Sequence, residues 1–454
     1  MESIWHKSEM IRPRTALDGD LDADCAVIGG GLAGVLTAWK LQRAGVRTVL
    51  LEADRLGGGQ TGGTTAKITA QHGPVYAQLL RQWGPERAGQ YARANQRAVE
   101  DYRRVVREED IDCGFADCSA YLFSQSQAAA MQAEVDAARR LGLEAHFTTK
   151  TELPFPVEGA VRFDGQARFH PLKFLAALAE ELTVYEHTRV LRVKGGRVET
   201  GHGTVRAKNV VFACHFPFPN LPGFYFLRLH QERSYVLALE GAAEMRDYYL
   251  GTDPGGLSFR PQGDLLLLGG GGHRTGENRG DSYRTLEDAA RRLYPGSKIA
   301  ARWSAQDCMS LDGVPYIGPF APSEPGWYVA TGFGKWGMTS SMAAANIIAG
   351  AISGRPDPDA GVFSPRRFRL GASAGNLRVN GWVTVKSLAK SCLPRQETAG
   401  AVPIPPRCPH LGCQMEWNSD EETWDCPCHG SRMDREGRIL DGPAQKGIAK
   451  DNKG

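Results

Sequence analysis

Two short segments rich in cysteine and histidine near the C-terminus constrain this 454-residue chain more than any other feature. The first runs from Cys408 to Cys413 (CPHLGC) and the second from Cys426 to Ser431 (CPCHGS), with fifteen residues between His410 and Cys426. Each contains two cysteines and one histidine, so the pair can supply two thiolates and two imidazoles as ligands. Two cysteines and two histidines suit a [2Fe-2S] cluster, with the cysteines on one iron and the histidines on the other. The same set also suits tetrahedral zinc, which remains the alternative.

Taken together, the two segments resemble the ligand arms of a Rieske iron-sulfur domain, over about the last 65 residues. The resemblance implies that Cys408 and Cys426 bind one iron of a [2Fe-2S] cluster and that His410 and His429 bind the other. Neutral imidazoles in place of two thiolates raise the reduction potential to about −150 to +300 mV. The cluster would therefore transfer single electrons.

Further residues of these arms resemble the respiratory-complex type of Rieske protein, in which an extra cysteine pair ties the two loops together. The resemblance implies a disulfide between Cys413 and Cys428. Ser431 stands where that type has a hydroxyl donor to the cluster, whereas Met433 stands where it has a tyrosine. One donor present and one absent predicts an intermediate potential. Because only a short, proline-bearing stretch (392–407) precedes the first arm, we expect a shortened Rieske domain.

An apolar stretch near the N-terminus leads directly into a glycine-rich turn, Gly29-x-Gly31-x-x-Gly34. A helical segment and a second apolar stretch follow, and the latter ends at Glu52, about twenty residues on. Gly29 permits the tight turn, Gly31 lets the backbone approach a pyrophosphate at the helix N-terminus, and Gly34 lets helix and strand pack closely. Glu52 is placed to accept hydrogen bonds from an adenosine ribose. The pattern predicts a Rossmann-type dinucleotide-binding domain.

A loop rich in glycine and threonine, residues 55–67, comes directly after that acid. Such a loop can enclose a cofactor with backbone amides and hydroxyls, and a plain surface loop is the alternative. With the preceding motif it resembles the D-amino-acid-oxidase-like superfamily of FAD-dependent oxidoreductases, which includes glycine and sarcosine oxidases. The resemblance implies FAD as the cofactor. It also implies FAD contacts from Arg55, Thr64, Thr65 and Lys67, and from the backbone of Val190 at the adenine.

A later stretch, residues 303–339, resembles the strand, glycine loop and helix with which this superfamily closes its FAD site. The helix N-terminus there suits the negative charge that a reduced flavin accumulates. The resemblance implies flavin contacts from Gly332, Gly334, Gly337, Met338 and Thr339.

The same stretch holds Cys308 followed by Met309. Relatives of sarcosine oxidase carry such a pair, in which the cysteine sulfur is bonded to the flavin. Here Ser310 replaces an aromatic residue and the spacing to Asp312 is shorter, so a covalent bond from Cys308 to FAD stays open.

Three polar residues are candidates for catalysis. Lys335 lies in the predicted flavin loop, and Tyr235 and His273 lie on predicted strands that resemble the sheet over the flavin. Either of the last two would serve as a polar anchor or proton acceptor beside the flavin, and a structural role is the alternative for each. His170, which precedes Pro171, is interpreted as a structural turn residue.

The resemblance implies an α/β fold. It predicts an FAD-binding Rossmann-type domain of the glutathione-reductase kind, an α+β substrate domain, and a small all-β Rieske domain. The oxidoreductase part would span 20–362, with FAD-binding parts at about 20–75, 155–215 and 325–362 and the substrate domain at about 76–154 and 216–324. A linker at 363–389, with one strand-like run at 382–385, would lead to the Rieske domain at 390–454.

Bulk properties exclude some functions. A hydrophobic content of 42%, a charged content of 23% and a net charge of +3 are ordinary for a soluble globular protein and argue against nucleic-acid binding. The longest uncharged run, residues 336–354, contains Asn346 and many small residues, which favours a packed helix over a transmembrane segment. The N-terminus shows no signal sequence, so we expect a cytoplasmic protein.

These features lead to two hypotheses. In the first, an amine or amino acid gives a hydride to FAD, and electrons leave singly through the Rieske cluster to a redox protein or a quinone-like acceptor. In the second, an electron-transfer flavo-iron-sulfur protein or reductase works without its own amine substrate. The second predicts an exposed histidine edge at the cluster and no substrate-sized cavity at the flavin. A purely structural cluster is a weaker third option.

Overall fold

The computed structural model describes residues 2–277, 280–367, 378–379, 381–383, 385–387 and 406–448. Most of the stretch predicted to precede the first cysteine arm lies outside these ranges. The prediction of a strand-like run at 382–385 is wrong, because residues 381–383 and 385–387 are helical. β-branched residues there favoured a strand, but short runs of this kind do not decide between helix and strand by themselves.

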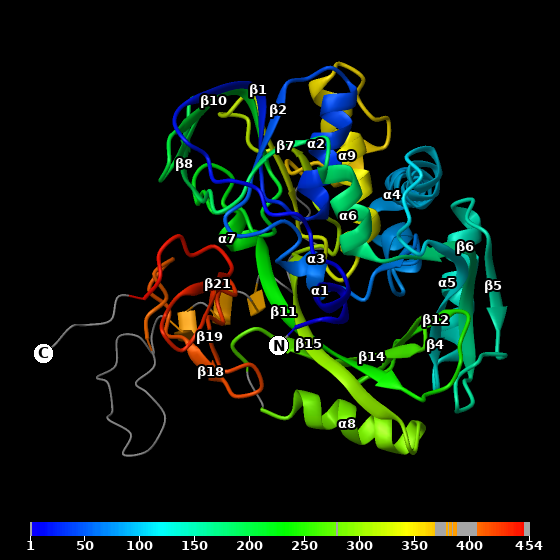
Figure 1. The fold of residues 1–454 in the computed structure, drawn as a ribbon. Helices are drawn as coiled ribbons and strands as arrows, with labels where there is room; N and C mark the ends of the chain where they lie inside the picture. The colour runs from blue at the N-terminus through cyan, green and yellow to red at the C-terminus, as the bar shows by residue number, and fades with distance from the viewer. Residues whose placement is uncertain are drawn as a thin grey trace, which may run out of the picture.

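A mainly parallel sheet forms the first unit of the fold (Figure 1). Its central strand β1 (Leu21–Ile28) pairs in parallel with β2 and β10, and its second half is buried, as expected for a strand covered on both faces. The strand order is β16-β17-β10-β1-β2-β7, with the hairpin β8–β9 attached to β10. The other strands are β2 (Thr48–Leu51), β7 (Thr183–Tyr185), β8 (Val190–Lys194), β9 (Arg197–Thr200), β10 (Thr204–Phe212), β16 (Tyr316–Pro319) and β17 (Trp327–Thr331).

A second, mostly antiparallel sheet has the order β15-β11-β14-β13-β12-β4-β6-β3, with β5 paired to β6. Its longest strands, β11 and β15, pair along nearly their whole length. The strands are β3 (Lys67–Ile68), β4 (Ala116–Ser124), β5 (Ala145–Thr148), β6 (Gly159–Arg168), β11 (Leu229–Glu240), β12 (Tyr248–Gly251), β13 (Ser258–Gln262), β14 (Leu265–Arg274) and β15 (Lys298–Ser310).

Strand pairing places three segments differently from the boundaries expected from the sequence. β3 falls in the segment 20–75 assigned to FAD binding, but it pairs with β6 in the second sheet. β6 falls in the segment 155–215 assigned to FAD binding, but it pairs with β4 and β5 in the second sheet. β16 falls in the segment 216–324 assigned to the substrate domain, but it pairs with β17 in the first sheet. The chain therefore enters the second sheet earlier than expected, at β3, and leaves it later than expected, after β6. It also returns to the first sheet earlier than expected, at β16.

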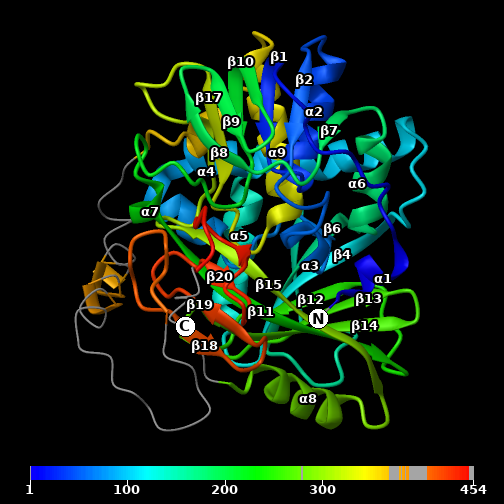
Figure 2. The ribbon, with the colours of Figure 1, turned by 60° about the vertical axis from the view of Figure 1, so that its left-hand side comes forward.

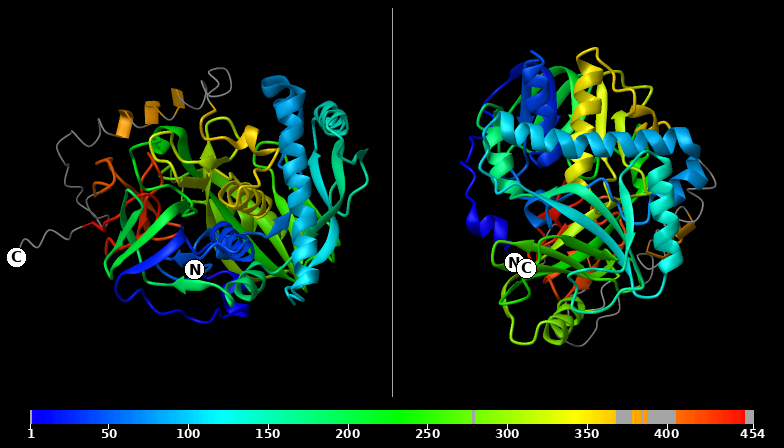
Figure 3. Two further views of the ribbon diagram at one scale, coloured as in Figure 1. Left: turned by 90° about the horizontal axis from the view of Figure 1, so that it is seen from above. Right: turned by 90° about the vertical axis from the view of Figure 1, so that its right-hand side faces the viewer.

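Helices cover both sheets. α2 and α9 pack against each other on the first sheet, while the long α4 runs along the side of the molecule away from the C-terminal sheet (Figure 3). The mostly buried α9 confirms the packed helix expected for the uncharged run, and no described helix is long and apolar enough to cross a membrane. The helices are α1 (Ile4–Ser8), α2 (Leu32–Arg43), α3 (Gln60–Gly63), α4 (Tyr76–Glu108), α5 (Ala128–Arg140), α6 (Pro171–Ala179), α7 (Tyr225–Arg228), α8 (Ser282–Leu293), α9 (Gly337–Ile352) and the 3-10 helix η1 (Ala360–Phe363).

The cysteine arms belong to a small third sheet of four antiparallel strands. The strands are β18 (Glu416–Asn418), β19 (Thr423–Asp425), β20 (Arg432–Met433) and β21 (Ile439–Asp441). Figure 2 shows this sheet beside β11 and α7. It has its own apolar core, which includes Met415, Trp424 and Met433.

The glycine turn after β1 generates the first prediction. A Cβ added at Gly34 would lie 1.9 Å from the Gly29 carbonyl oxygen, so Gly34→Ala forces helix α2 away from the turn. We expect a loss of about 3 kcal/mol in the free energy of unfolding, at the upper end for overpacking, together with loss of the bound dinucleotide. Thermal unfolding and cofactor content measure both. Gly201→Ala, where a Cβ meets nothing within 4 Å, is the matched control. A Gly34→Ala protein as stable as the control would contradict the packing argument.

Candidate functional site

The turn between β1 and α2 brings its glycines against the end of β10 and to the start of the helix. Gly29 has φ of 113°, and a Cβ there would lie 2.5 Å from the Ala213 carbonyl oxygen at the end of β10. Gly31 is the N-cap of α2. The strand, turn and helix therefore bring the N-terminal amides of α2 to the edge of the sheet where β2 and β10 also end, the usual location for a phosphate group.

Glu52 follows β2 at the same edge. Its Oε2 accepts a hydrogen bond from the Gly30 N–H (2.6 Å) and its Oε1 accepts one from the Asp54 N–H (2.8 Å). Burial raises the pKa of Glu52, while these two amides act in the opposite direction. The carboxylate is thus held against the glycine turn, where an adenosine ribose is expected.

A cavity of about 420 Å³ runs from this edge to the N-terminus of α9. The predicted FAD residues that line it come from β1, β2, the glycine loop, β8, β15 and the loop before α9. They are Gly29, Gly31, Glu52, Arg55, Thr64, Val190, Cys308, Gly332, Gly334, Gly337 and Met338. The candidate catalytic residue Lys335 lines it as well.

Four predicted FAD residues lie outside the lining of this cavity. Gly34 packs beneath the turn, and Thr65 is only partly buried in the loop. Lys67, on β3, donates a hydrogen bond to Ser258 in the second sheet, and burial lowers its pKa to about 7. Thr339 donates to the Thr69 carbonyl oxygen (2.9 Å). The side chain of Lys67 therefore links two strands of the second sheet, and that of Thr339 ties α9 to the segment after β3.

The three catalytic candidates lie in two places. Lys335 Nζ is held by Asp307 Oδ2 (3.2 Å) and Glu232 Oε2 (3.3 Å). Desolvation would lower the pKa of Lys335, but these carboxylates raise it overall, so the side chain is a cation and not a base at neutral pH. Tyr235 and His273, in contrast, bond to each other (3.0 Å) and do not line the cavity.

Tyr235 and His273 lie instead beneath the third sheet. Asn418 Nδ2, at the end of β18, donates to the Tyr235 hydroxyl (3.3 Å). His273 Nδ1 lies 2.8 Å from the Arg274 carbonyl oxygen. The tyrosine is fully buried, so this pair belongs to the contact between the second and third sheets.

Cys308 lies on β15 with its sulfur inside the cavity wall, near Thr331 Oγ1 (3.6 Å). Burial raises the pKa of the Cys308 thiol to about 12. A bound FAD would bury the thiol further. The sulfur is therefore placed near the expected flavin but is not held as a reactive thiolate.

The sequence interpretation missed several residues of the cavity wall. Arg233 and Gln306 reach it from β11 and β15, and His215 reaches it from the turn after β10. The sequence pointed to these three residues only through their positions at strand ends or on strands expected to face the flavin. Six more come from the third sheet, and nothing in the sequence indicated them: Arg432, Ile439, Leu440, Asp441, Gly442 and Gln445.

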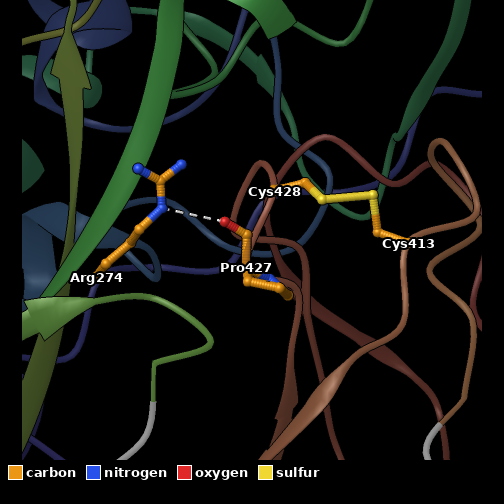
Figure 4. The surroundings of a disulfide bond; sticks show 4 residues. All are labelled: Arg274, Cys413, Pro427 and Cys428. Atoms are coloured by element: carbon orange, nitrogen blue, oxygen red, sulfur yellow. Dashed lines mark hydrogen bonds between the residues drawn. A yellow bond between two sulfur atoms is a disulfide. The ribbon is translucent and has the colours of Figure 1, made fainter. Parts of the chain in front are cut away.

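The two cysteine arms meet at the edge of the third sheet. The structure joins Cys413 to Cys428 by a disulfide (Figure 4), the pair that the resemblance implied. This leaves Cys408 and Cys426 as free buried thiols, hydrogen-bonded to each other. That contact and the amide of His410 lower the pKa of Cys408 to about 7 against the effect of burial, whereas the same contact and burial raise the pKa of Cys426, so Cys408 is the thiol that loses its proton first.

The two histidines complete this ligand set. The rings of His410 and His429 lie 4.9 Å apart, and among the described residues neither buried Nδ1 has a hydrogen-bond partner. Burial lowers the pKa of His410 to about 4 and that of His429 to about 3, so both rings are neutral. Two neutral Nδ1 atoms without partners beside two thiols are what metal binding requires of this set.

The side of each imidazole ring that lies away from Nδ1 faces the oxidoreductase part. His410 Nε2–H donates to Asn220 Oδ1 (2.8 Å), which leaves Nδ1 as the free lone pair. The His429 ring bonds to the Phe226 backbone and packs edge-on against Phe216 and Phe226. The exposed histidine edge expected for a freely docking electron carrier is therefore absent at His429, which is 2% exposed.

The disulfide generates a prediction for the third sheet. It closes a loop of 15 residues, for which the chain-entropy model gives about 3 kcal/mol. The double variant Cys413→Ala/Cys428→Ala should therefore lose its cluster at a lower urea concentration, followed by visible absorbance. Cys118→Ala, which removes a thiol in the second sheet, should behave as wild type. Equal urea midpoints for cluster loss in the wild type, the double variant and Cys118→Ala would show that the disulfide does not support the cluster.

The buried thiol generates a second prediction. Because Cys308 stays protonated, we expect acid denaturation to release all FAD into the supernatant, as it would in Cys308→Ala. Absorbance at the flavin maximum in pellet and supernatant measures this. Yellow colour that stays with the wild-type polypeptide and is lost from Cys308→Ala would demonstrate a covalent bond instead.

Comparisons with known proteins agree with this geometry. The family model for FAD dependent oxidoreductases matches residues 24–351, and that for the Rieske [2Fe-2S] domain matches residues 377–450. The putative Rieske 2Fe-2S iron-sulfur protein YhfW of Bacillus subtilis (strain 168) is 34% identical over 98% of this chain and 96% of its own. Gamma-glutamylputrescine oxidoreductase of Escherichia coli (strain K12) is 23% identical over 75% of this chain and 86% of its own.

Among solved structures, glycine oxidase from Geobacillus kaustophilus superimposes with a TM-score of 0.66 at 19% identity, covering 77% of this chain and all of that one. The Rieske match decides between iron-sulfur and zinc for the two cysteine arms. The chain belongs to the family of FAD-dependent oxidoreductases and carries a C-terminal Rieske domain, so its cofactors are FAD and a [2Fe-2S] cluster.

Proposed function

We propose that the protein dehydrogenates an amine or amino-acid substrate and sends the electrons one at a time through the Rieske cluster to a redox protein or quinone-like acceptor. The substrate carbon gives a hydride to FAD and the nitrogen loses a proton, so an imine forms and two electrons are passed on. FAD accepts the pair, and the cluster transfers electrons singly. The substrate class rests on the relatives, whose printed names include glycine oxidase and gamma-glutamylputrescine oxidoreductase.

One observation carries the proposal: one side chain in one case, and two in another, connect the wall of the FAD cavity to the second cluster arm. Gln306 lines the cavity, and its Nε2 donates to the Gly430 carbonyl oxygen (2.9 Å). His215 also lines the cavity and bonds to Gln231 Oε1 (2.7 Å), whose Nε2 lies 3.4 Å from the His429 carbonyl oxygen. Two cofactors held this close within one chain support direct electron transfer between them.

The residues of the cavity wall support charge changes at the flavin. Lys335 is a fixed cation in the loop before α9, and the helix N-terminus adds a partial positive charge. The helix N-terminus favours the negative charge that FAD gains on reduction. Lys335 is paired with Glu232 and with Asp307, which lines the same cavity, so its role in the proposal is to offset these carboxylates, and proton transfer is left to the substrate amine and solvent.

The rival hypothesis of a freely docking electron carrier gains no support from the histidine edges, which pack against Asn220, Phe216 and Phe226. A cytoplasmic location remains part of the proposal. Its support is chemical: the five cysteines outside the third sheet that the structure describes are unpaired thiols, as expected in a reducing compartment.

An anaerobic titration tests the proposal. Primary and secondary amines and amino acids are mixed singly with the full protein without oxygen. At least one should bleach the flavin absorbance, after which the paramagnetic signal of a reduced [2Fe-2S] cluster should rise. In the cluster-ligand variant His429→Ala, the same compound should still bleach the flavin while the cluster signal is lost.

Two outcomes would contradict the proposal. Bleaching by NADH or NADPH with no response to any amine would indicate a reductase. Flavin reduction by an amine without any cluster signal in wild type, combined with unchanged turnover in a folded His429→Ala protein, would indicate a structural cluster.

A further inference from the structure

The Rieske domain forms one wall of the FAD cavity. Six of its residues line that cavity: Arg432, Ile439, Leu440, Asp441, Gly442 and Gln445. All six lie on β20, β21 or the turn after β21. The domain that carries the cluster therefore also shapes the space that FAD occupies.

Asp441 is the acidic residue of this wall, and two side-chain amides donate hydrogen bonds to its carboxylate. Gln60 Oε1 accepts from the backbone N–H of Gln306 (2.5 Å), so Gln60 must turn its Nε2 toward Asp441 Oδ2 (2.6 Å). Gln306 Nε2 donates to the Gly430 carbonyl oxygen, so it too presents an N–H to Asp441 Oδ2 (3.2 Å). Two amides, from α3 and β15, thus hold one carboxylate of the Rieske domain at the cavity.

The wall rests directly on the second cluster arm. A Cβ at Gly442 would lie 2.6 Å from Ser431 Cα, and the Ala444 N–H donates to Ser431 Oγ (3.2 Å). Within the arm, the Cys426 N–H donates to the Ser431 carbonyl oxygen (2.8 Å). Any loosening of the arm when Cys426 and His429 lose their iron is therefore passed to Asp441 through contacts between backbones.

We propose that the FAD site is completed by the Rieske domain, with Asp441 as an acceptor for hydroxyl or N–H donors of bound FAD, and that cluster loading and FAD binding stabilise each other. The coupling follows because both groups order the same segment, residues 426–445, from its two ends. Thermodynamic linkage makes the effect reciprocal.

The first test measures FAD affinity in the full-length protein after removal and re-addition of FAD. Asp441→Asn keeps one acceptor oxygen for the Gln60 and Gln306 amides, but it replaces the other carboxylate oxygen by an N–H donor that opposes the Gly442 N–H and cannot accept from FAD. The dissociation constant for FAD should therefore rise about tenfold or more, with iron content and cluster spectrum unchanged. Glu436→Ala, an exposed site in the same domain, should match wild type. A dissociation constant for Asp441→Asn within twofold of wild type would overturn the role of Asp441.

The second test uses only the wild-type protein and stands even where the variant fails to fold. Iron release to a chelator is followed with and without saturating FAD, and FAD affinity is measured with and without the cluster. We expect slower iron release with FAD and weaker FAD binding without the cluster. Equal release rates and equal affinities would overturn the coupling.

Discussion

The contact between the Rieske domain and the second sheet depends on one carboxylate, that of Glu421, whose side chain is 11% exposed. It bonds to Arg233 Nη2 on β11 (3.0 Å), accepts from the Tyr283 hydroxyl on α8 (2.7 Å), and lies 3.5 Å from Arg432 Nη2 in its own domain. Burial would raise the pKa of Glu421, but the two guanidinium groups lower it overall. Removing one partner of such a group leaves an uncompensated buried charge, which costs far more than the pair itself contributes. Glu421 and Arg233 therefore make this arrangement of the two units specific.

Close backbone approach then brings the second cluster arm onto the sheet. A Cβ at Gly276 would lie 2.6 Å from Pro427 Cα, and a Cβ at Gly430 would lie 2.6 Å from Gln231 Cβ. Arg274 adds a hydrogen bond from its Nε to the Pro427 carbonyl oxygen (3.2 Å), which Figure 4 shows beside the disulfide. Two glycines, one on each side, thus allow the contact between Gln306 and Gly430 on which the proposed electron transfer depends.

Local patterns in the sequence were enough for features that neighbouring residues determine. The turn at Gly29 to Gly34 and its acid, Glu52, have the predicted geometry because short-range sterics require it. The cysteine arms could be recognised from ligand spacing, although their pairing into ligands and disulfide came from family resemblance.

Features that depend on contacts between distant segments could not be found in this way. Tyr235 and His273 lie on the expected strands, but the side chain of Asn418 occupies the Tyr235 hydroxyl, so polar residues on a flavin-facing sheet are poor evidence for catalysis. Thr339 and Lys67 stand in the predicted loops yet turn away from the cavity. Asp441 lies 381 positions from Gln60, and no local pattern links two such residues.

The two cluster arms differ in their surroundings, and this difference distinguishes the side of the cluster that faces FAD from the side that faces solvent. Every residue of the second arm, from Cys426 to Ser431, is buried against the oxidoreductase part, whereas Pro409 and Leu411 of the first arm are exposed. The second arm is also the one that Gln306 and Gln231 connect to the FAD cavity. Under the proposed function, electrons enter the cluster from the side of the second arm. Among the described residues the first arm is the exposed side of the cluster, with the His410 ring partly exposed beside Asn220, so an acceptor in solution would approach there.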